Sequence, residues 1–86
     1  ELLSVAHLHG VDAEVVELIA TPKSDITRKP LSKLANYFRQ HNIVIGGVEQ
    51  DGVWKVAVGS TDIKPHNRVV AVCPSQNLNK VRQLFN

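Results

Sequence analysis

The sequence has too few cysteines and too little continuous apolar character for several classes of protein. A single cysteine, Cys73, excludes an intramolecular disulfide framework and favours a reducing compartment, which we take to be the cytoplasm. No apolar run approaches the roughly 20 residues that span a bilayer, and no signal peptide is recognisable. Methionine is absent and the chain begins at Glu1, so we expect it to be a piece of a longer protein.

The chain also has little excess of positive over negative charge. The formal net charge is +2, and the basic residues do not form the stripe or cluster that is typical of nucleic-acid-binding proteins. The densest basic group is interrupted by Asp25 and is typical of a solvated face; it consists of Lys23, Arg28, Lys29 and Lys33. We therefore expect no nucleic-acid partner.

Motifs for catalysis and for cofactor binding are missing. No Gly-x-Gly-x-x-Gly loop occurs, so we expect no dinucleotide cofactor in these residues. No nucleophile motif surrounds any serine, and the acidic residues Glu49, Asp51 and Asp62 fall at predicted turns. His7 and His9, two positions apart on a predicted helix, point in different directions and cannot share one ion. We therefore expect no catalytic residue, no metal site and no enzyme.

What the sequence does contain is typical of a small globular domain. Apolar residues make up 43% of the 86 residues and charged residues 21%, a composition that predicts one domain with a modest core. Residues 1–10 carry apolar side chains at helical spacing, and Gly10 would end that helix. We interpret residues 1–10 as a linker helix from a missing N-terminal domain, and residues 11–86 as the domain itself.

Strand and helix patterns alternate after residue 10. Asp51-Gly52 lies between two apolar runs and is the strongest short-range signal of a β-hairpin. Pro65-His66-Asn67 predicts a corner in which the asparagine adopts the unusual backbone. The fold class is therefore α+β, one small sheet with helices packed on it in the order β-α-β-β-β-α. The predicted elements are a strand over 14–20, a helix over 30–41, strands over 43–50, 53–58 and 68–73, and a closing helix after Ser75.

Four segments resemble the C-terminal domain of TrkA-type proteins, the RCK-C (regulator of K+ conductance, C-terminal) family. Residues 12–18 are similar to its opening strand, residues 31–34 to its short helix, and residues 42–52 to its hairpin. The most specific similarity is residues 61–70, Thr-Asp-Ile-Lys-Pro-His-Asn-Arg-Val-Val. They follow the family pattern Thr-x-Ile-x-Pro-x-Asp-x-apolar, with Asn67 in place of the aspartate.

The resemblance implies a non-catalytic regulatory domain that forms a homodimer and senses a small ligand in the cleft between the two copies. It would belong to a cytoplasmic subunit, peripheral to the inner membrane, that controls a membrane K+ uptake transporter. NAD or ATP would bind only to a separate, missing nucleotide-binding domain. Two alternatives stay open: a similar domain attached to another membrane transporter or antiporter, and a small enzyme or nucleic-acid binder with the same layout.

The segment Ile43-Val44-Ile45 carries the site prediction. In a sheet with one covered face only alternate residues face the core, so consecutive aliphatic residues indicate that the second face is also covered. A second copy of the chain would supply that cover. The predicted interface or ligand-cleft residues are Phe38, Asn42, Ile43, Val44 and Ile45. The alternative, that they pack within one chain, stays open.

Trp54 and Cys73 are the other two side chains with a functional alternative. Trp54 is the largest apolar side chain, and we expect it in the core, with a partner surface as the alternative. Cys73 lies in a strand that is predicted to be buried. No lysine or histidine flanks it to stabilise a thiolate, so we expect an unreactive thiol.

Overall fold

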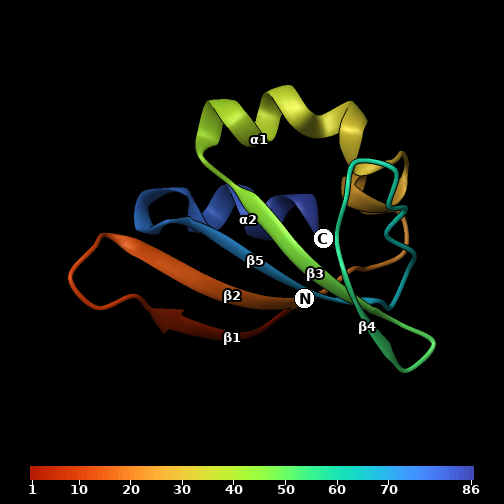
Figure 1. The fold of residues 1–86 in the computed structure, drawn as a ribbon, viewed down its shortest axis with the longest axis horizontal. Helices are drawn as coiled ribbons and strands as arrows, with labels where there is room; N and C mark the ends of the chain where they lie inside the picture. Colours follow the sequence, from red (N-terminus) through yellow and green to blue (C-terminus); the bar gives the residue numbers. More distant parts are fainter.

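The computed structural model describes all residues from Glu1 to Asn86. A five-stranded antiparallel sheet of order β1-β2-β5-β3-β4 forms its centre, and two helices pack on it (Figure 1). The strands are β1 (Leu2–His7), β2 (Ala13–Ile19), β3 (Val44–Gln50), β4 (Val53–Val56) and β5 (Arg68–Pro74), and the helices are α1 (Ala35–His41) and α2 (Leu78–Leu84). The order from β2 onward is β-α-β-β-β-α, so the predicted α+β class is confirmed.

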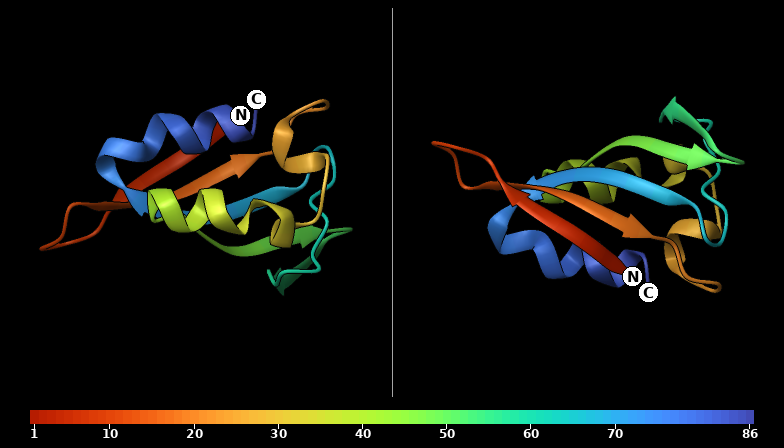
Figure 2. Two further views of the ribbon diagram at one scale, coloured as in Figure 1. Left: turned by 90° about the horizontal axis from the view of Figure 1, so that it is seen from above. Right: turned by 90° about the horizontal axis from the view of Figure 1, so that it is seen from below.

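Both helices lie on the same side of the sheet, and no helix covers the other face (Figure 2). Along β5, Val69, Ala71 and Cys73 are buried, whereas Val70 and Val72 between them are half-buried. This period of two is expected where a strand has one face on the core. We call the uncovered side the open face of the sheet.

The first ten residues do not form the expected linker helix. Leu2–His7 is the edge strand β1, which pairs antiparallel with β2. Four of its six residues are apolar, and so short a run fits a helix as well as a strand. The edge of β2 decides between them, because its free N–H and C=O groups require partners. Gly10, with a φ of 81°, turns the chain between the two strands and does not end a helix.

The hairpin of β3 and β4 forms as predicted. Asp51 and Gly52 both have positive φ, 53° and 78°, as a two-residue turn compatible with strand twist requires. The pairing of β3 with β5 shifts between Ile45 and Gly47. This irregularity lies at two adjacent glycines, Gly46 and Gly47, and glycine in a strand often marks such a bulge.

Trp54 lies outside the core, so that expectation was wrong. Its indole ring covers Gly47 on the neighbouring strand, where the missing side chain leaves room for the ring. Trp54 pairs with Glu49 at the outer edge of the sheet and points to the open face. The side chain is 56% exposed because no helix covers that face.

Each helix begins with a tight 3-10 turn. Leu31–Leu34 precedes α1, so the helix predicted from residue 30 starts in a different conformation. Asn42 ends α1 in the left-handed conformation (φ 56°, ψ 42°). Ser75 begins the 3-10 turn before α2, and its hydroxyl donates to Glu14 Oε1 at 3.0 Å. Neither helix has the length or the apolar run that a membrane crossing needs.

The corner before β5 is held by the side chain of Asn67. His66, and not Asn67, has the unusual backbone, with a φ of 72°. Asn67 Oδ1 accepts hydrogen bonds from Lys64 N–H (2.9 Å) and from Gln50 Nε2 (3.0 Å). Asn67 N–H donates back to Lys64 O at 3.1 Å. The corner is thereby tied to the end of β3.

We expect Asn67→Ala to lower the free energy of unfolding by about 1–2 kcal/mol, because two donors lose their acceptor. Asn67→Asp keeps an acceptor oxygen at the same position and should stay close to the parent protein. Urea unfolding followed by circular dichroism measures both variants. Equal destabilisation by Asn67→Asp would contradict the role of this oxygen.

Candidate functional site

The five predicted interface or cleft residues surround the turn from α1 into β3, but they do not share one surface. Ile43 is 5% exposed and belongs to the core, whereas Val44 is 58% exposed on the open face. Phe38 and Ile45 are half-buried and pack against the core from the helix side. Asn42 is exposed at the end of α1. Their role at an interface stays a prediction, but one contact surface cannot include all five side chains.

The separation of these side chains follows from the pairing of β3 with β5. Val44 lies opposite Val72, and Ile45 lies opposite Ala71. Ala71 is buried under the helices and Val72 points to the open face. The consecutive aliphatic residues therefore alternate in direction, as in any strand. In a single chain nothing covers Val44.

Phe38 and Ile45 line a depression between α1, β3 and the chain that follows β4. We call it the apolar hollow; its volume is about 230 Å³. Six of the eight lining residues are hydrophobic and none is charged. They are Leu31, Ser32, Ala35, Phe38, Ile45, Ala57, Val58 and Gly59.

Backbone hydrogen bonds hold the walls of the apolar hollow. Ser32 N–H donates to Gly59 O at 2.8 Å and joins the start of the helix to the chain after β4. Ile43 N–H donates to Phe38 O at 2.8 Å and fixes α1 against β3. Since these donors are used within the fold, the hollow offers a ligand mostly carbon atoms. Such a surface suits a flat apolar ring and contains no acid or base.

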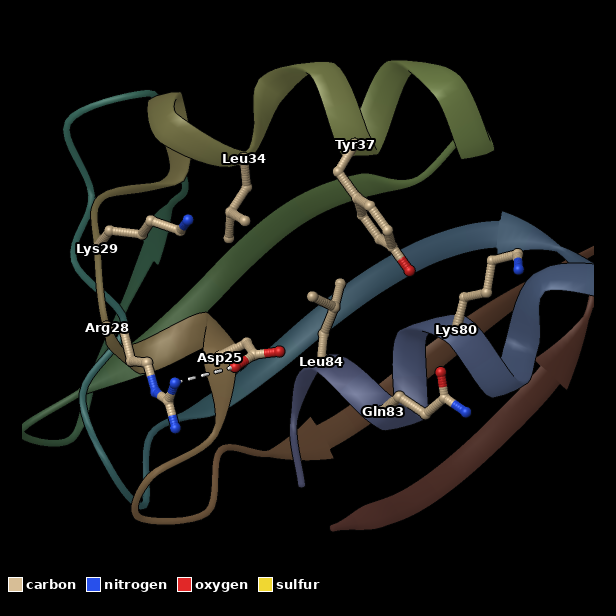
Figure 3. Close-up of a pocket in the computed structure, with 8 residues that line it drawn as sticks. All are labelled: Asp25, Arg28, Lys29, Leu34, Tyr37, Lys80, Gln83 and Leu84. Carbon is tan, nitrogen blue, oxygen red and sulfur yellow. Dashed lines mark ion pairs between the residues drawn. The ribbon is translucent and has the colours of Figure 1, made fainter.

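A second, larger cavity of about 430 Å³ lies between α1, α2 and the chain that leads to α1 (Figure 3). Three of its side chains are basic and one is acidic, so we call it the basic cavity. None of the five predicted residues lines it. Its lining residues are Asp25, Arg28, Lys29, Leu34, Tyr37, Lys80, Gln83 and Leu84. Sequence reasoning missed it because the closing helix, about 50 residues further on, supplies its second wall.

Comparison with solved structures identifies the fold of the chain. No family model matches the chain, and no curated protein is similar to it in sequence. The RCK-C domain dimer of S. agalactiae BusR in complex with c-di-AMP superimposes with a TM-score of 0.68 and 21% identity, over 81% of this chain and 86% of that chain. The chain has the RCK-C fold. The resemblance noted in the sequence is thereby confirmed for the fold.

A second RCK-C structure overturns one expectation. S. agalactiae BusR in complex with its busAB-promoter DNA has a TM-score of 0.70 and 19% identity, over 96% of this chain and 40% of that chain. The chain thus spans about two fifths of the length of that protein, whose structure contains DNA. The prediction of no nucleic-acid partner was wrong, because it rested on net charge alone, whereas a protein with the same fold is in complex with DNA.

The RCK-C sheet also carries one polar cluster, between β1, β2 and the start of the closing helix. Glu14 Oε1 lies 2.9 Å from His7 Nδ1 and accepts the hydroxyl of Ser75, while Glu14 Oε2 is buried without a partner. The hydrogen bond with His7 lowers the pKa of Glu14 below its usual 4.5; burial opposes this effect, and Ser75 adds to it. Sequence reasoning missed the pair because it placed His7 on a helix.

Cys73 lies opposite Glu14 in the pairing of β2 with β5 and is 1% exposed. Burial raises the pKa of its thiol, and the negative charge of Glu14 raises it further. The thiol therefore stays protonated at neutral pH, in line with the unreactive cysteine that the sequence predicted.

The lowered pKa of Glu14 predicts a specific acid sensitivity. The ionised carboxylate stabilises the folded state fully above pH 4.5, and this contribution is lost as the pH falls through the lower folded-state pKa. In Glu14→Gln, the free energy of unfolding should fall less steeply below pH 4.5 than in the parent chain. Denaturant titrations across this range measure it, with Glu49→Gln, an exposed residue without a side-chain partner, as the control. If the free energy of unfolding falls with the same slope below pH 4.5 in Glu14→Gln and in the parent chain, Glu14 is not the source of this acid sensitivity.

Proposed function

We propose that this chain is a regulatory domain that pairs with a second copy of itself and binds a cyclic dinucleotide of the c-di-AMP type. The supporting observation is the fold shared with the RCK-C domain of BusR, whose structure is a dimer in complex with c-di-AMP. The proposed role is ligand sensing, without catalysis. It agrees with the absence of charge and of acid-base groups in the apolar hollow.

The apolar hollow suits one base of such a ligand. Phe38 and Ile45 offer apolar surface for the face of an adenine ring, and the hydroxyl of Ser32 has no hydrogen-bond partner within the chain. The hollow of about 230 Å³ is smaller than the range of about 300–1,000 Å³ that is usual for a small-molecule pocket. A second copy would therefore complete the cleft.

Symmetry supports the same arrangement. Two copies of one chain usually pair about a two-fold axis, which places the same surface of each copy face to face. A cyclic dinucleotide with two identical bases has matching symmetry. One ligand per dimer would then place one base in each apolar hollow, with the phosphates between the two copies.

We further propose that the ligand acts on a transport system through the parts of the protein beyond this domain. The TrkA-type resemblance favours control of a K+ uptake transporter. BusR in complex with promoter DNA supports transcriptional control as the second candidate. In either case the ligand must bind two arrangements of the dimer with different affinity, because only that difference shifts their populations.

The site of the proposed ligand is tested by Ala35→Glu. Ala35 is exposed and lines the apolar hollow, so a carboxylate there fills the hollow and repels the phosphates without removing core packing. We expect at least about a tenfold loss of c-di-AMP affinity by isothermal titration calorimetry. Asn36→Glu adds the same charge at the next exposed position, outside the hollow, and should bind like the parent chain. If the parent chain does not bind c-di-AMP, the proposed ligand is wrong. If Ala35→Glu binds c-di-AMP with the same affinity as the parent chain, the ligand does not bind in the apolar hollow.

Pairing is tested by light scattering. We expect c-di-AMP to shift the chain toward twice the mass of one chain, with calorimetry giving one ligand per two chains, because a ligand between two copies stabilises the pair by mass action. Cyclic di-GMP, which has the same backbone and different bases, serves as the control. A chain that stays monomeric while saturated with c-di-AMP would contradict the shared cleft.

A further inference from the structure

The basic cavity has no part in the proposed function, yet its side chains form a coherent site. Leu34 and Tyr37 enter it from the α1 side and Leu84 from α2, while Lys29 and Lys80 lie on opposite sides (Figure 3). Leu34 and Leu84 are almost fully buried, at 9% and 6% exposure. The cavity thus has an apolar floor and a polar rim.

The charge on the rim is unbalanced. Arg28 Nη1 lies 3.6 Å from Asp25 Oδ1, so the only carboxylate of the cavity already has a partner. Neither Lys29 nor Lys80 forms an ion pair. Two positive charges at the border of the cavity are therefore uncompensated, and an anion in the cavity would gain from both.

Several polar groups around the cavity are unpaired. The hydroxyl of Tyr37 and the side-chain amide of Gln83 form no hydrogen bond within the chain, and an ammonium group can only donate. The Tyr37 ring is held by His41, with ring centroids 4.5 Å apart. A complementary ligand is therefore rich in acceptor oxygens and carries negative charge.

We propose that the basic cavity is a second ligand site, which binds a small organic phosphate such as a nucleoside monophosphate. The flat body of the ligand lies on Leu34 and Leu84, and its phosphate lies at the polar rim, which Lys29 and Lys80 border from opposite sides. A phosphate monoester carries about −1.5 to −2 charges at neutral pH. This charge balances two free ammonium groups better than the single charge of a carboxylate ligand would. The volume of about 430 Å³ lies within the range of about 300–1,000 Å³ that is usual for such ligands.

The test uses adenosine monophosphate as the probe in calorimetric titrations of the intact chain. Lys29→Gln/Lys80→Gln removes both rim charges and should weaken binding by on the order of tenfold to a hundredfold. The matched control, Lys33→Gln/Lys64→Gln, removes the same charge from exposed lysines outside the cavity and should change affinity by less than about twofold. Thermal melts of both double variants verify that they fold.

Further titrations separate this site from the apolar hollow and from simple ion binding. Ala35→Glu, which blocks the hollow, should leave the affinity for adenosine monophosphate unchanged. Adenosine and inorganic phosphate, each lacking one half of the ligand, should both bind at least about tenfold more weakly than the nucleotide. The proposal is overturned if the parent chain does not bind the nucleotide, if both double variants bind it equally, if Ala35→Glu abolishes binding, or if inorganic phosphate binds as well as the nucleotide.

Discussion

Strand β5 is hydrogen-bonded along both edges, to β2 on one side and to β3 on the other, and the rest of the domain is attached through it. Its inward residues Val69, Ala71 and Cys73 are buried in the core, and α2 contacts this strand. The Asn67 corner sets where the strand begins, and Pro74 ends it immediately before the closing helix. β2 and β3, the strands on either side, are therefore held in place by this one strand.

The covering of only one face of the sheet has a functional consequence. Both helices must share that face, and α1 then separates the two cavities. Leu34 and Tyr37 line the basic cavity, whereas Ala35 and Phe38 line the apolar hollow. A seven-residue helix with its 3-10 lead-in thus borders both sites.

Local signals predicted local geometry well. The Asp51-Gly52 turn formed because few dipeptides tolerate positive φ at both positions. The Pro65 corner formed too, although the positive φ fell on His66 and Asn67 contributed its side-chain oxygen. The sequence predicted the arrangement of the five site residues less well. Four of its five residues are consecutive and Phe38 precedes them by one helical turn, but strand alternation directs Val44 to the face opposite the remaining apolar side chains.

The sequence by itself determined the order of strands and helices from β2 onward and the α+β class, because these follow from short-range backbone preferences and from apolar periodicity. Only the tertiary structure decided the rest. It made residues 2–7 a strand because the edge of β2 needed partners, and it brought His7 to Glu14. It also set Lys29 and Lys80 around one cavity. These contacts join segments far apart in the chain, and only the packing of helices on a common sheet face brings them together.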